Sequence, residues 1–155
     1  MGKRLQVLCA TVAAALLVVG VVNAASGSPG GPKHQRLRVR AIVTELNRVS
    51  VGTNGPALGD QVVFSNKLLR HGKDVGHQGV VCTTVSVERN KAECAVTFAL
   101  SGGQITEQAL VTLGTTAPYA VAITGGSGSY EGAEGEIRVR PVSPTERILT
   151  LRIED

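Results

Sequence analysis

Polar side chains on apolar strand faces are the groups of this sequence best suited to chemistry. Glu45 continues the alternating apolar series of residues 37–43, and Asn47 follows it two positions later. Asn66 interrupts a second such series, residues 62–68. A desolvated carboxyl group is costly unless it is hydrogen-bonded, and such groups often have a function. We therefore predict that Glu45, Asn47 and Asn66 are catalytic. The alternative is that the alternation ends here and Glu45 is solvated at a rim.

Metal-dependent and nucleophilic chemistry have little support in the sequence. The three histidines stand at positions 34, 71 and 77, in an N-terminal lead-in and in one loop. No group of His, Cys or carboxylate residues has the spacing of metal ligands, and the sequence has no nucleophile elbow. We therefore expect no metal site and no hydrolase activity.

A glycine-rich stretch, residues 125–135, lies between two strand-like runs. A dinucleotide-binding loop would need a third glycine where Glu131 stands, and a helix after it. The residues that follow, 135–142, instead alternate with period two and include a proline. The stretch therefore predicts an irregular connection between two strands rather than a phosphate-binding loop.

Period-two alternation runs through nearly the whole chain after residue 35, and no window there has helical periodicity. Eight short strands without room for crossover helices favour an antiparallel meander. Closure into an eight-stranded up-and-down β-barrel would remove exposed edges and leave room inside for one small ligand. A β-sandwich is the alternative. The predicted strands are Arg36–Leu46, which Arg48–Val51 could extend into a hairpin, Asp60–Arg70, Gly79–Glu88, Ala92–Leu100, Gln104–Leu113, Tyr119–Thr124, Gly135–Val142 and Thr145–Glu154.

The N-terminal residues have the pattern of an export signal. Two basic residues, Lys3 and Arg4, precede a long apolar run that ends in small residues. We therefore divide the chain into a signal peptide, 1–24, a flexible Ser-, Gly- and Pro-rich lead-in, 25–35, and one β-barrel domain, 36–155. This predicts a secreted, extracellular protein with no membrane association after cleavage. An uncleaved membrane anchor is the alternative.

The chain after the signal is only weakly basic. The formal net charge of the whole sequence is +4, and the signal carries two of the basic residues. The sequence has two Phe, two Tyr and no Trp. Weak charge without an aromatic platform argues against a nucleic-acid partner. We expect a small hydrophobic molecule as the partner instead.

Two cysteines, Cys82 and Cys94, remain after the signal. An even number of cysteines in an oxidising compartment favours a disulfide. The two residues lie on neighbouring predicted strands, and a hairpin centred near residue 88 places them opposite each other. We predict a structural disulfide; a free thiol that lines a cavity is the alternative.

Three ordered motifs resemble those of the allene oxide cyclases and, more loosely, of the dirigent proteins. They are TELN at 44–47, LGDQVVFSNKL at 58–68 and ITGGSGSYEGAEG at 123–135. The resemblance spans about residues 43–141, most of the chain after the lead-in. It implies an eight-stranded antiparallel barrel that binds a small hydrophobic compound and steers its stereoselective cyclisation or coupling without a cofactor. Related barrels are often trimers, so it also allows a homotrimer.

The resemblance further implies roles for individual residues. Glu45 would polarise the reacting system, and Asn47 and Asn66 would hold a water molecule at the substrate oxygen. Cys82 would shape the pocket, and Thr116 stands where the family has a pocket tyrosine. The chain departs from the family after Asn47, where it is shorter and lacks a serine-proline pair that helps to hold the water.

The predicted ligand pocket consists of Cys82, Thr116 and the two phenylalanines, Phe64 and Phe98. Three classes of function remain open at this point. The first is a cyclase-like or dirigent-like barrel with polar groups in an open cavity. The second is a lipocalin-like binding protein with an apolar cavity, and the third is a structural extracellular barrel filled by its own side chains.

Overall fold

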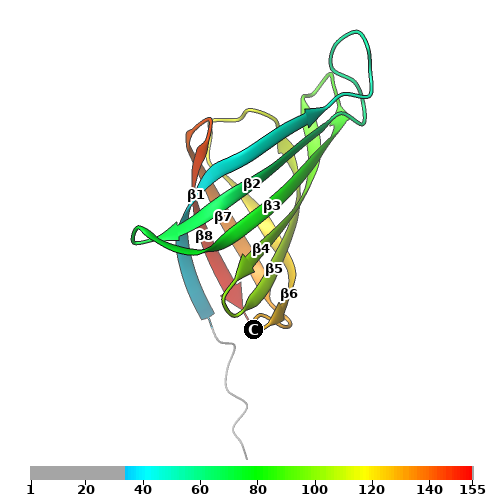
Figure 1. Cartoon of the computed structure of the whole chain (residues 1–155). Coiled ribbons are helices and arrows are strands. Elements are labelled where there is room, and N and C mark those ends of the chain that lie inside the picture. The colour runs from blue at the N-terminus through cyan, green and yellow to red at the C-terminus, as the bar shows by residue number, and fades with distance from the viewer. Residues whose placement is uncertain (1–33, 155) are drawn as a thin grey trace, which may run out of the picture. The chain divides into compact units, whose positions relative to one another are not determined.

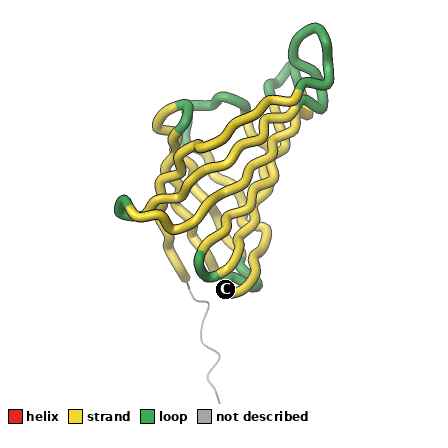
Figure 2. Tube along the Cα trace, viewed as in Figure 1, coloured by secondary structure: helices red, strands yellow, loops and turns green. Residues whose placement is uncertain are grey.

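Residues 34–154 are described by a computed structural model; the predicted signal peptide and most of the predicted lead-in lie outside them. Eight antiparallel strands form a closed barrel in which each strand pairs with the next and β8 pairs with β1 (Figures 1 and 2). This all-β closed barrel confirms the predicted fold class. The strands are β1 (His34–Val49), β2 (Gln61–Arg70), β3 (Lys73–Ser86), β4 (Lys91–Leu100), β5 (Gly103–Thr112), β6 (Tyr119–Gly128), β7 (Glu134–Ser143) and β8 (Glu146–Glu154).

The first strand is longer at both ends than predicted. His34 and Gln35, placed in the flexible lead-in by composition, belong to β1 because they pair with the end of β8. At the other end β1 continues to Val49 in register with β2, so the predicted hairpin at Arg48–Val51 does not form. Within residues 34–154, no helix is long and apolar enough to cross a membrane.

The barrel interior has a packed half and an open half. The largest fully buried side chains lie near the ends of even-numbered strands or the starts of odd-numbered strands, toward the end of the barrel where β1 begins and β8 ends, and they fill that half: Leu68, Phe98, Ile105, Ile137, Leu151 and Ile153. Each comes from the inward-facing set of its strand, since successive side chains of a strand point to opposite faces. This packed half forms the floor of the site.

The glycine-rich stretch forms the end of β6 and the connection to β7, at the packed end of the barrel (Figure 1). A Cβ atom on Gly126 would collide with the carbonyl oxygen of Tyr130, and one on Gly135 with that of Arg152. Gly135 also has a φ of +124°, which side chains with a Cβ rarely adopt. The stretch is therefore a strand connection, as predicted, whose glycines permit close backbone packing.

Asp60 holds the long loop between β1 and β2 at the opposite end. Its carboxylate accepts hydrogen bonds from the amides of Ala57 at 2.8 Å and Val51 at 2.9 Å. These amide donors lower the pKa of Asp60 below its ordinary value. The aspartate of the LGD motif therefore orders a loop beside the open half.

Candidate active site in the open half of the barrel

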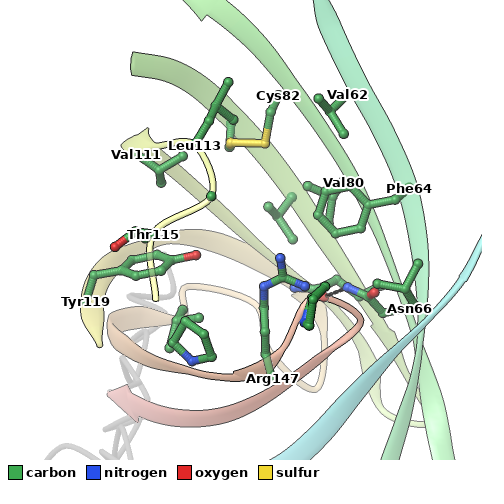
Figure 3. Close-up of a pocket in the computed structure, with 18 of the residues that line it drawn as sticks. Val62, Phe64, Asn66, Val80, Cys82, Val111, Leu113, Thr115, Tyr119 and Arg147 are labelled. Atoms are coloured by element: carbon green, nitrogen blue, oxygen red, sulfur yellow. Dashed lines mark hydrogen bonds between the residues drawn. A yellow bond between two sulfur atoms is a disulfide. The ribbon is translucent and has the colours of Figure 1, made fainter. Parts of the chain in front are cut away.

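A cavity of about 610 Å³ occupies the open half of the barrel. Its volume is in the range typical of pockets that hold small organic ligands. All eight strands and the loop between β5 and β6 contribute to its wall (Figure 3). Most of the wall is apolar, including Val62, Phe64, Val80, Val96, Leu113 and Leu149. A few polar groups interrupt this wall.

Two amide side chains lie at the floor of the cavity. Asn66 on β2 is 2 % exposed, and its Nδ2 donates a hydrogen bond of 2.5 Å to Oε1 of Gln78 on β3. The pair is positioned by strand register, because Asn66 and Gln78 are directly opposite each other. Oδ1 of Asn66 is buried and accepts no hydrogen bond from residues 34–154. It can therefore accept one from a ligand or from a water molecule.

Glu107 on β5 carries a largely buried carboxyl group in the cavity wall. Its backbone lies opposite Val96 of β4, so the side chain continues an inward-facing apolar layer. The Oε2 atom has no hydrogen-bond partner among the described residues. Burial disfavours the charged form and raises the pKa of Glu107 from 4.5 to about 7. Both protonation states are therefore populated near neutral pH.

Tyr119 and Arg147 enter the cavity from β6 and β8 (Figure 3). Burial raises the pKa of Tyr119, and the nearby Arg147 guanidinium partly opposes this effect. The hydroxyl group therefore stays protonated at neutral pH and can donate a hydrogen bond. The guanidinium carbon of Arg147 lies 5.6 Å from the centre of the Phe64 ring, within the range of a cation–π contact.

A β-bulge in β1 places Glu45 and Asn47 differently from the prediction. The pairing with β2 shifts between Val43 and Glu45, so Thr44 is an extra residue and the alternation of the strand changes phase. After the bulge, Leu46 and Arg48 line the cavity, whereas Glu45 and Asn47 do not. Of the three predicted catalytic residues, these two are exposed, on a separate depression of about 290 Å³ between β1 and β2, whereas Asn66 lines the cavity.

The other predicted pocket residues divide between the cavity and the core. Phe64, Cys82 and Thr116 line the cavity. Phe98 does not, because its position on β4 lies in the packed half, opposite Gln78 and Ile105, and its side chain is 0 % exposed.

Cys82 and Cys94 form a disulfide between β3 and β4. The residues are directly opposite in the strand register, and both line the cavity. The predicted pairing is therefore present, and Cys82 is a disulfide sulfur in the wall rather than a lone thiol.

Replacement of both cysteines by alanine is expected to lower the free energy of unfolding by about 2–3 kcal/mol, because the bond closes a short loop in the unfolded chain. Urea unfolding of the oxidised protein and of the Cys82→Ala/Cys94→Ala variant measures the difference. Equal stability of the two proteins would show that the bond does not constrain the unfolded state.

Four groups of the site, Gln78, Glu107, Tyr119 and Arg147, are not among the predicted site residues. Alternation points to three of them, and Tyr119 stands in the inward series of Val121. Glu107 lies two positions after the buried Ile105 on β5, and Arg147 lies two positions before the buried Leu149 on β8, so each shares the inward face of its strand. Gln78 lies just outside the predicted strand Gly79–Glu88, whereas β3 begins at Lys73. Among residues 34–154, no three His, Cys, Asp or Glu side chains are grouped as metal ligands.

Comparison with known proteins identifies the family. The sequence profile of the allene oxide cyclase barrel-like domain matches residues 40–151. Among solved structures, a pyocyanin demethylase is 30% identical, with a TM-score of 0.67, and the match covers 76% of this chain and 99% of that one. No curated protein matches the sequence.

Two further structures share the fold at lower identity. A pterocarpan synthase dirigent protein is 22% identical, with a TM-score of 0.62 and coverage of 80% of this chain and 90% of that chain. The Diels–Alderase AbmU from Streptomyces koyangensis is 16% identical, with a TM-score of 0.61 and coverage of 81% and 70%. The profile match spans most of the barrel, and the chain belongs to the allene oxide cyclase-like barrel family.

Proposed function

We propose that the open half of the barrel binds a small, largely apolar organic compound and catalyses its isomerisation by ring closure, with Glu107 as the group that transfers a proton. The observation that carries this proposal is the Glu107 carboxyl, which lies in the cavity wall with one oxygen unpaired and a pKa raised to about 7. A general acid or base works best when its pKa is near the working pH.

The chemistry needs no co-product, because a cyclisation rearranges the bonds of one molecule. Glu107 takes a proton from one position of the substrate and returns it at another, so no atom is gained or lost. The apolar wall excludes water and selects the conformer in which the reacting ends meet. Asn66 and Tyr119 supply an acceptor and a donor for the polar atoms of the substrate.

The mixed lining supports this function over the two alternatives. A barrel filled by its own side chains would leave no space, whereas a cavity of about 610 Å³ is present. A purely apolar binding protein would not need a buried carboxyl, and burial of an ionisable group without a partner is costly. Such groups are more common at functional sites than elsewhere.

A second candidate activity is the one for which a similar structure is named, demethylation of pyocyanin. It is favoured by the 30% identity to the pyocyanin demethylase over 99% of that chain. Pyocyanin itself is therefore one substrate to test, and a product without a methyl group would identify this activity.

Export from the cell is part of the proposal. It rests on the basic and apolar residues of 1–24 and on the disulfide, which persists in oxidising compartments. The protein is then expected in the medium with its N-terminus near Ala25.

The test begins with native mass spectrometry of the secreted protein after exposure to a lipid-soluble extract of the medium. Any bound compound is identified, and its conversion is followed by the protein and by the Glu107→Gln variant. The proposal expects a bound compound, a product of the same mass, and loss of conversion in the variant. Unchanged conversion by the variant would exclude Glu107 as the proton-transferring group, and absence of any bound compound would count against the whole proposal.

A further inference from the structure

Arg147 is a cation inside the cavity that forms no ion pair with a carboxylate of the described residues. Ion pairs among residues 34–154 involve other arginines, including Arg40 with Glu146 at 2.7 Å and Arg138 with Glu136 at 3.0 Å. Those arginines lie on the outer face of the barrel, whereas Arg147 lines the cavity. It lies beside the rings of Phe64 and Tyr119, and the Glu107 carboxyl, which also acts on Tyr119, is in the same cavity wall.

We infer that the ligand is a flat organic anion, an aromatic or conjugated carboxylate or phenolate, and that the Arg147 guanidinium binds its charged group. This inference names the substrate class for the function proposed above and uses that same cavity. The inference depends on the position and the charge of Arg147 on β8, and it does not depend on the proton transfer proposed for Glu107.

The charges of the cavity wall favour an anion. The wall contains two arginines, Arg147 and, where β1 nears its end, Arg48, and a single acidic side chain, Glu107. Burial keeps part of the Glu107 population protonated at neutral pH, so the wall carries a net positive charge. A cavity with apolar walls strengthens the attraction between such a charge and an anionic ligand, because the effective dielectric constant is low.

The position of the guanidinium suits a planar partner. It lies over the Phe64 ring, and Figure 3 shows it between Tyr119 on one side and Phe64 and Asn66 on the other. A guanidinium group binds a carboxylate through two parallel hydrogen bonds in its own plane. The body of the ligand would then extend along the apolar wall formed by Val80, Val96 and Val111 toward the Cys82–Cys94 disulfide.

Two probes of equal shape and different charge test the inference. Calorimetry measures binding of naphthalene-2-carboxylate and of naphthalene-2-carboxamide to the full-length protein and its variants at neutral pH. The unchanged protein is expected to bind the carboxylate roughly tenfold or more tightly than the amide, as charge-assisted hydrogen bonds are stronger than neutral ones. Arg147→Met, which keeps an apolar stem, is expected to abolish this preference while amide binding changes by less than about twofold.

Matched variants separate this contact from the general field of the protein. Arg38→Met removes the same charge from an exposed position on β1 and is expected to keep the preference. Arg147→Lys keeps the charge without the planar fork and is expected to keep only part of it. Thermal unfolding confirms that each variant is folded.

Several outcomes would overturn the inference. They are equal binding of the two probes by the unchanged protein, no binding of either, a preference that survives in Arg147→Met, or its loss in Arg38→Met.

The proposed function is judged separately by Glu107→Gln. If Glu107→Gln loses turnover but the unchanged protein does not prefer the carboxylate probe, the proton-transfer role is supported and the anionic ligand is excluded. If Glu107→Gln keeps its turnover and the unchanged protein prefers the carboxylate probe, the proton-transfer role is excluded and the anion site is supported.

Discussion

The Glu107→Gln variant is expected to lose turnover by about 10²- to 10⁴-fold and, at about pH 8, to be more stable than the unchanged protein. Gln has nearly the same shape as Glu but cannot exchange a proton at neutral pH. The loss of turnover follows from the proposed role as general acid and base. The gain in stability has a separate cause, because burial penalises the ionised carboxylate.

The direction of the pH effect follows from proton binding. With a pKa of about 7 in the folded state and an ordinary value of 4.5, the folded protein binds more protons than the unfolded chain between these limits. Stability contributed by Glu107 is therefore present below about pH 4.5 and is lost as the pH rises to 7. The full difference corresponds to roughly 3 kcal/mol. The Glu107→Gln variant has no ionisable carboxyl at this position, so it does not lose this stability as the pH rises.

Urea unfolding at several pH values between 4 and 8 measures the effect. The two proteins should have similar stability at pH 4 and diverge as the pH rises. A matched control is Glu134→Gln, which removes the same charge from an exposed position and should change stability by less than about 0.5 kcal/mol. Parallel curves for Glu107→Gln and the unchanged protein would contradict the burial of an ionised carboxylate.

Replacement of Phe98 by alanine is expected to destabilise the barrel by about 3–5 kcal/mol. Phe98 is 0 % exposed in the packed half, so its removal loses buried apolar surface and leaves a void among large side chains. Chemical denaturation with a linear extrapolation to zero denaturant provides the measurement.

Phe64 is the matched control, because the chain has only two phenylalanines and this one lines the cavity. Its side chain is already partly exposed, so Phe64→Ala should cost less than about 2 kcal/mol of stability. It should weaken ligand binding instead, through the lost contact with Arg147. If the two variants were equally destabilised, the division into a packed and an open half would be wrong.

The architecture was predictable from local patterns. Period-two alternation marked eight strands, and turn residues separated them. The same pattern also fits a β-sandwich, and only the resemblance to the allene oxide cyclases favoured the closed barrel. The pairing of Cys82 with Cys94 followed from the same register and is confirmed. These features are predictable because strand direction and hairpin register depend on nearby residues.

The site was predictable only in part, because its position depends on tertiary structure. Phe98 and Phe64 stand in equally apolar strands, and only the packing of the closed barrel shows which one meets the cavity. Glu107 was overlooked because it lies among residues of an ordinary strand, and its burial becomes visible only when β4 and β5 pair. A single extra residue in β1 redirected Glu45 in a way that alternation alone does not show.

The bulge at Thr44 also gives β1 two alternative chemical faces. With the extra residue, the strand directs an aliphatic and a basic side chain, Leu46 and Arg48, to the cavity. Regular pairing of the same residues, with Thr44 opposite Ser65 and no bulge, would direct a carboxylate and an amide, Glu45 and Asn47, to the same place. A shift of this pairing by one residue, with no change of sequence, would therefore exchange a basic side chain of the interior for an acidic one. Strand register, as well as substitution, is thus a route by which a barrel of this kind changes its ligand.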